Sequence, residues 1–70
     1  MKKGLSKAVI KTMDMLEVGK EFTARQFKYW FDGVYGENGF YIDTVMRRVR
    51  EWCSSRYVYN KKSKLYKKIA

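Results

Sequence analysis

Histidine and proline are absent from this 70-residue sequence, and cysteine occurs once. Without histidine, and with a single thiol, the chain lacks the usual ligands of a zinc site and the partners of a Cys–His catalytic pair. The sequence indicates no other nucleophile–base pair and no carboxylate dyad. We therefore expect no enzyme activity, no catalytic residue, no metal site and no cofactor. We expect the single thiol, Cys53, to be a small buried hydrophobe.

Long hydrophobic runs are missing as well. Polar residues interrupt the apolar ones throughout residues 1–16, which predicts neither a signal peptide nor a membrane span. A lone cysteine also precludes an internal disulfide, which is typical of a reducing cytoplasm, so we expect a cytoplasmic protein with no membrane partner. There is no Pro-rich linker and no internal repeat. The length predicts one domain over residues 1–70.

Positive charge is what the sequence has in excess, with a net charge of +9. Residues 47–70 hold nine basic residues and one acidic residue, whereas residues 1–46 hold seven basic and six acidic residues. Nearly all of the excess therefore lies in the last third of the chain. A concentrated positive field attracts phosphate polymers or an anionic membrane surface, whereas charge that served only solubility would be spread more evenly.

The best-defined element is a helix over residues 41–54. Its apolar side chains recur at helical spacing and form one stripe: Ile42, Val45, Met46, Val49, Trp52 and Cys53. The opposite face is polar and largely basic, with Asp43, Thr44, Arg47, Arg48, Arg50 and Glu51 on it or at its flanks. Two interpretations follow, a helix that binds a nucleic acid with this face or an ordinary surface helix with a solvated basic face.

Two further helices are predicted before it. The first covers residues 5–17, with Ser6 as its N-cap and Gly19 beyond its end. The second covers residues 24–32 and begins after a capping box, in which Thr23 and Gln26 satisfy each other's backbone amides. Between them, residues 20–22 are long enough only for a bridge strand or an extended linker.

Glycine and aromatic residues define the remaining segments. Three glycines within residues 33–39 predict a loop. We expect the side chains of Val34 and Tyr35 in this loop to pack against the core. After the third helix, residues 57–59 and 64–69 read as two strands around a polar tip over residues 60–64, which is a β-hairpin. The fold class expected is therefore mainly α with a small β-hairpin.

A dense core is needed because a chain of this size buries only about 60% of its unfolded surface. We expect six large side chains to be mostly buried: Phe27, Trp30, Phe31, Val45, Val49 and Trp52. On this expectation, Trp52→Ala would lower the free energy of unfolding by about 3–5 kcal/mol.

This order of elements resembles the winged helix-turn-helix family. The closest local match is the run Thr44-Val45-Met46-Arg47-Arg48-Val49-Arg50-Glu51, which resembles the T-V-x-R-R-L-R-E run that opens the recognition helix of many prokaryotic and viral members. The resemblance implies three helices and a C-terminal wing, and a function in sequence-specific binding of double-stranded DNA as a transcription regulator. It departs from the family in its longer, glycine-rich turn before the third helix.

The resemblance also implies roles for individual residues. In such proteins the third helix enters the major groove, and the residues placed nearest the bases here are Tyr41, Asp43, Thr44, Arg47 and Arg48. The wing and flanking cations would meet the DNA backbone or a minor groove, and they are Arg50, Arg56, Lys61, Lys62, Lys64, Lys67 and Lys68. A regulator that reads a palindrome acts as a homodimer on DNA, an arrangement that the sequence leaves open.

Two other functions stay open from the residues alone. A protein-interaction module would show an exposed apolar patch, to which Tyr29, Tyr35 and Tyr41 are candidates. A binder of RNA or single strands would stack bases on Tyr57, Tyr59 or Tyr66, although strand tyrosines more often form cross-strand pairs.

Overall fold

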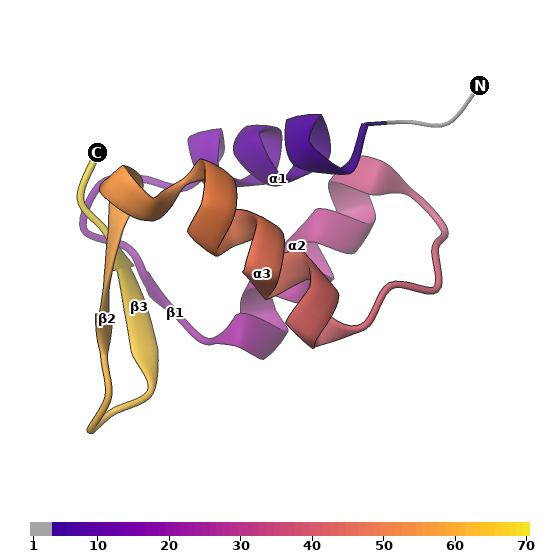
Figure 1. Ribbon diagram of the computed structural model, residues 1–70. Helices are drawn as coiled ribbons and strands as arrows, with labels where there is room; N and C mark the ends of the chain where they lie inside the picture. The colour runs from indigo at the N-terminus through magenta and orange to yellow at the C-terminus, as the bar shows by residue number, and fades with distance from the viewer. Residues whose placement is uncertain (1–3) are drawn as a thin grey trace.

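The computed structural model describes residues 4–70 as three helices and a small antiparallel sheet (Figure 1). In chain order the elements are α1 (Leu5–Asp14), β1 (Glu21–Phe22), α2 (Ala24–Tyr35), α3 (Ile42–Trp52), the 3₁₀ turn η1 (Ser54–Arg56), β2 (Tyr57–Asn60) and β3 (Leu65–Lys68). The α+β class and the order of elements agree with the sequence-based prediction.

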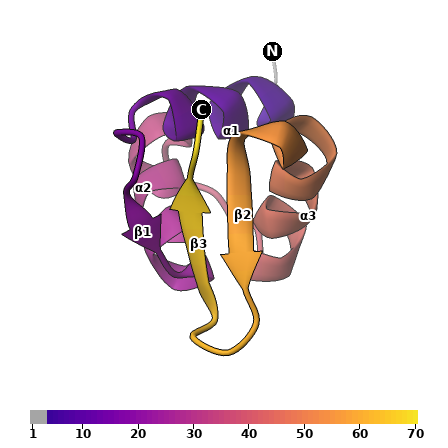
Figure 2. The same cartoon turned by 90° about the vertical axis from the view of Figure 1, so that its left-hand side faces the viewer.

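The sheet has β3 in the middle, with β1 and β2 antiparallel on either side of it. The predicted hairpin is thereby confirmed, and the predicted bridge strand pairs through Glu21 and Phe22 with Lys67 and Tyr66. The tip of the hairpin projects beyond the helices (Figure 2). One end of the sheet is therefore anchored on the helices, while the other end is free to reach outward.

The core lies where the three helices and the inner face of the sheet meet. Its members are Ala8, Val9, Met13, Phe22, Phe27, Phe31, Val45, Met46, Val49 and Cys53. Four of the six predicted core side chains, together with Cys53, are confirmed as buried. Trp30 is only partly buried and packs edge-on against Phe22, with 6.1 Å between ring centroids.

The prediction for Trp52 is wrong, because this side chain is 53% exposed. Trp52 lies about 75° around the helix from the centre of the buried stripe, and it is the last residue of α3. The apolar spacing placed it at one edge of the stripe, where the neighbouring elements do not cover it. The large loss of stability expected for Trp52→Ala therefore does not apply.

Helix α1 ends three residues earlier than predicted. Its N-cap is Gly4 rather than Ser6, and no side chain caps it. After Asp14 the chain turns back toward the sheet. Gly19 adopts a positive φ of 94°, and its N–H donates to the carbonyl of Lys68 at 2.7 Å. Pairing with the end of β3 thus sets the path of this segment. The spacing of apolar residues in a helix cannot predict such a long-range contact.

Helix α2 shows the opposite deviation and continues past Gly33 to Tyr35. Its predicted capping box is confirmed, since Gln26 N–H donates to Thr23 Oγ1 at 3.1 Å and Thr23 N–H donates to Gln26 Oε1 at 2.9 Å. At the other end, Tyr35 stacks on Phe31 with 5.3 Å between ring centroids. Burial of this last turn offsets the intrinsic cost of a glycine inside the helix.

The loop between α2 and α3 is held by Asn38. Its amide donates to Asp32 Oδ1 at 3.0 Å and to the carbonyl of Gly36 at 2.7 Å. Its side-chain oxygen accepts the N–H of Phe40 at 3.1 Å. The glycine-rich segment is therefore a connector that fixes where α3 begins, in keeping with the predicted loop.

Candidate nucleic-acid interface

Helix α3 presents a polar face that points away from the core. Asp43, Arg47 and Arg50 are exposed on it, whereas Thr44 and Arg48 are half-buried. Asp43 lies in the first turn, where the helix dipole favours a carboxylate. Tyr41 occupies the N-cap position and is 80% exposed. The five residues predicted to contact bases therefore lie on α3 or at its N-cap, but they differ in how accessible they are.

Ion pairs divide the arginines of the last third into two groups. Arg48 donates to Glu51 at 3.0 Å, and Arg56 pairs with Asp14 and donates through Nε to the carbonyl of Ala70 at 3.3 Å. Arg47 and Arg50 have no carboxylate within ion-pair distance among residues 4–70. These two arginines carry the uncompensated charge of the helix.

The hairpin carries the second set of accessible cations: Lys61, Lys62, Lys64 and Lys67, all of them exposed. None of the four pairs with a carboxylate in the part of the chain that the structure describes. Asn60 shapes the tip, because its side-chain oxygen accepts the N–H of Lys62 at 2.9 Å and of Ser63 at 3.2 Å. Lys64 completes the turn with a positive φ of 57°. The three tip lysines are thus held together at the projecting end of the molecule.

Among the cations expected to meet the DNA backbone or form the wing, Lys68 belongs to the hairpin but is buried. Lys68 is only 5% exposed, and its ammonium donates to the carbonyl of Leu16. Side chains alternate along a strand, so Lys68 shares the inner face with Tyr66, while Lys67 points outward. The alternation of side chains along a strand could have predicted from the sequence that Lys67 and Lys68 lie on opposite faces of the sheet. Arg56 is also drawn toward α1 by Asp14 rather than toward the hairpin tip.

Three tyrosines gather on the inner face of the hairpin. Tyr66 lies 4.5 Å from Tyr59 and 5.4 Å from Tyr57, measured between ring centroids. Burial raises the pKa of Tyr57 and of Tyr66, and the nearby positive charge of Arg50 partly opposes this rise at both. Tyr59 and Tyr66 form a cross-strand pair, whereas Tyr57 lies opposite Lys68.

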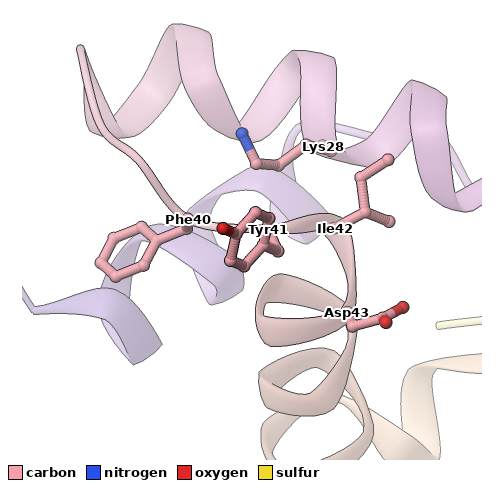
Figure 3. A pocket seen from close by; sticks show the side chains of 5 residues that line it. All are labelled: Lys28, Phe40, Tyr41, Ile42 and Asp43. Carbon is pink, nitrogen blue, oxygen red and sulfur yellow. The ribbon is translucent and has the colours of Figure 1, made fainter.

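A hollow of about 540 Å³ lies at the start of α3, between this helix and α2. Its lining residues are Lys28, Phe40, Tyr41, Ile42 and Asp43. The Lys28 ammonium is bound to Asp32 at 2.6 Å, and Asp43 points away from both Lys28 and Tyr41 (Figure 3). The same contact with Lys28 is the main cause that lowers the pKa of Asp32. The polar groups of this hollow do not converge on one point.

A second, more apolar surface lies between α1 and α2. Met15 and Tyr29 are 63% and 76% exposed there, and with Trp30, Asp32, Gly33 and Val34 they line a hollow of about 500 Å³. Tyr29, Tyr35 and Tyr41 each line a different hollow. These three tyrosines therefore do not form the single exposed apolar patch that was expected of a protein-interaction module.

Within residues 4–70, no group of three or more His, Cys, Asp and Glu side chains is placed to hold a metal ion. The helices in this part of the chain are too short or too polar to cross a membrane. Comparison with protein-family models, with curated proteins and with solved structures finds no match.

Proposed function

We propose that this chain is a winged helix-turn-helix domain that binds double-stranded DNA. In this proposal α3 enters the major groove, and the β2–β3 hairpin is a wing that lies on the adjacent backbone or minor groove. The order of helix, bridge strand, two helices and hairpin supports this reading, as does the resemblance of the run from Thr44 to Glu51. The family relationship itself rests on that layout and on that run.

One observation carries the proposal. Two arginines on α3 and four lysines on the hairpin are exposed and have no carboxylate partner among the described residues: Arg47, Arg50, Lys61, Lys62, Lys64 and Lys67. The arginines lie on a helix of the core, and the lysines lie on the hairpin, whose tip projects beyond the helices (Figure 2). Exposed cations without a carboxylate partner suit a polyanion, whose binding releases condensed counterions.

The residues of α3 take different roles in this arrangement. Arg47 is exposed at the centre of the polar face and is suited to the two acceptors of a guanine. Tyr41 and Asp43 lie at the end of the helix that approaches the bases, and Asp43 is suited to accept from a cytosine amine. Half-buried Thr44 and the paired Arg48 contribute less than their sequence positions imply.

The proposal includes a cellular role for this domain. A domain of this kind acts as a transcription regulator in the cytoplasm of a prokaryotic cell, or in that of the host if the gene is viral. A homodimer would place two recognition helices about 34 Å apart on a palindromic site. A molecular mass measured with and without DNA determines whether the chain acts in this way.

A binding assay with duplex DNA, single-stranded DNA and RNA at several salt concentrations tests the proposal. With roughly four to six phosphates contacted, log K for duplex should fall against log salt with a slope of about −4 to −5. Duplex should also be bound more tightly than the other two probes. Stronger binding of a single strand, or affinity that hardly changes with salt, would contradict the proposal.

A further inference from the structure

The outer face of α2 carries a protruding aromatic ring beside an open hollow. Tyr29 lies on the opposite side of the helix from the buried Phe27 and Phe31, and its side chain is exposed. One turn further along α2, Gly33 lines the hollow of about 500 Å³ between α1 and α2. Met15 lines the same hollow and is exposed as well. A large apolar side chain and an apolar hollow therefore lie side by side on one surface.

Nothing within the described chain requires glycine at position 33. Gly19 and Gly36 adopt a positive φ, whereas Gly33 has helical backbone. A Cβ added at Gly33 would meet no atom within 4 Å. Neither backbone conformation nor close packing therefore calls for this residue, although glycine disfavours a helix relative to every residue except proline. The missing side chain keeps the hollow open to a group that enters from outside the chain.

The charges on this face of α2 are complementary to each other but lie too far apart to pair within one copy. Arg25 lies one turn before Tyr29, is exposed and has no carboxylate partner among residues 4–70. Asp32 lies one turn after Tyr29, and its side chain is 44% exposed. Lys28 and Asn38 both donate to its Oδ1, which leaves Oδ2 for a further donor. Two turns of helix, about 10 Å, separate Arg25 from Asp32.

The position of this surface also suits contact between two copies of a strongly basic chain. The uncompensated arginines and lysines lie on α3 and the hairpin, and Figure 2 shows α2 and α3 on opposite sides of the molecule. Two copies that meet through α2 keep these charges apart. An approach through α3 or the hairpin would instead bring like charges together.

We propose that a second copy of this chain docks on this surface, with the two α2 helices packed antiparallel about a two-fold axis. Tyr29 of each copy enters the hollow over Gly33 of the other, and Arg25 of each copy reaches Oδ2 of Asp32 in the other. Antiparallel packing sets the start of one helix against the end of its partner, so both contacts form twice and the interface closes on itself. The inference rests on the proposed function in giving its homodimer a surface, but this dimer forms without DNA.

Sedimentation equilibrium over a range of protein concentrations, without DNA, tests the dimer. The average mass should rise with concentration from that of one chain toward that of two. Gly33→Gln fills the hollow and Tyr29→Ser removes the ring, and each should raise the Kd of the dimer at least about tenfold. A chain that stays monomeric at every concentration, or a dimer that these two variants leave intact, would overturn the proposal.

Thermal unfolding of Gly33→Gln, at a concentration where the chain is monomeric, separates loss of the interface from loss of the fold. Glutamine favours a helix over glycine, and its Cβ enters open space, so the midpoint should rise by a few degrees while the dimer weakens. Gly39→Gln is the matched control, because a Cβ at Gly39 also meets no atom within 4 Å but lies in the loop before α3. Its Kd for dimerisation should stay within about twofold of the wild-type value.

A charge reversal tests the polar part of the interface. Arg25→Glu sets a carboxylate opposite Asp32 of the other copy and should raise the Kd about tenfold or more. Lys7→Glu makes the same change of charge at an exposed position on α1 that does not line this hollow. It should stay within about twofold of wild type. Equal effects of the two reversals would remove the contact between Arg25 and Asp32.

Nuclear magnetic resonance on a mixture of isotope-labelled and unlabelled copies locates the contact directly. We expect an intermolecular nuclear Overhauser effect between the ring of Tyr29 in one copy and the Hα atoms of Gly33 in the other. Adding duplex DNA to the same mixture keeps this result distinct from the fate of the proposed function. Duplex binding by a chain that lacks this contact would remove the dimer surface and leave the proposed function standing. The contact without any binding of duplex would support the dimer surface and contradict the proposed function.

Discussion

Arg47 and Arg48 are adjacent in the sequence, but only Arg47 has its charge uncompensated. Arg48 donates to Glu51 at 3.0 Å, whereas Arg47 is exposed and pairs with no carboxylate among the described residues. If α3 reads bases, Arg47→Ala should weaken binding to the preferred duplex by about 1–3 kcal/mol and to random duplex much less.

Arg48→Ala is the matched control and should have a smaller effect on both DNAs. The preferred site is first selected from a random pool, and binding curves are then measured for each variant. Equal losses on preferred and random DNA for Arg47→Ala would mean that this side chain meets phosphate rather than bases.

Lys67 and Lys68 offer a second contrast between neighbours, because one faces solvent and the other is buried. The Lys68 ammonium donates to the carbonyl of Leu16, so Lys68→Ala should lower the free energy of unfolding by about 1–3 kcal/mol. Lys67→Ala should change stability by less than about 0.5 kcal/mol. Denaturant titration measures both. Similar stability of the two variants would contradict the buried position of Lys68.

At the scale of single elements, the hairpin and α3 should respond differently to loss of charge. Lys61 and Lys62 lie at the projecting tip and are suited to phosphate contacts, which give position but no sequence information. Lys61→Ala or Lys62→Ala should weaken preferred and random duplex by similar amounts and lower the salt slope by about one unit per lost contact. A changed sequence preference in either variant would instead make the hairpin the reading element.

The start of α2 provides a test of local stability. Thr23→Ala removes the hydroxyl that accepts the N–H of Gln26 and should lower the free energy of unfolding by about 0.5–2 kcal/mol. Ser6→Ala is the control, because the N-cap of α1 is Gly4 and no side chain caps this helix. Chemical denaturation of both variants should show a clear loss for the first and little for the second. Equal effects would place a cap at Ser6 after all.

The type of each element was predictable from local pattern, whereas its ends were not. The spacing of apolar residues and the capping residues predicted three helices and a hairpin, because both depend on residues that are close together in the sequence. The end of α1 depends on pairing between Gly19 and Lys68, and the last turn of α2 depends on the contact of Tyr35 with Phe31. Contacts between segments far apart, or the burial of one turn, override the local signal at such positions.

At the scale of the whole molecule, contacts between distant segments also decide which residues of the candidate interface are accessible. Sequence placed seven cations on the wing and flanks, but Lys68 is buried and Arg56 pairs with Asp14. Asp14 lies more than forty residues before Arg56, so no local pattern indicates this pair. What the sequence did locate was the uneven spread of charge. Tertiary contacts then decide which of those charges is available to a ligand.

The uncompensated cations on α3 and the hairpin lie apart from the apolar hollow between α1 and α2, which is lined by Met15, Tyr29, Trp30 and Val34. These two surfaces are therefore separate candidates for partners of different chemistry. We propose that duplex DNA binds the surface formed by the uncompensated cations.

Backbone amide chemical shifts recorded during titration with duplex DNA test this claim most directly. We expect the largest changes within residues 41–50 and 58–67, while Met15, Tyr29 and Val34 stay nearly unchanged. Changes centred on those three residues, with α3 and the hairpin unaffected, would contradict it.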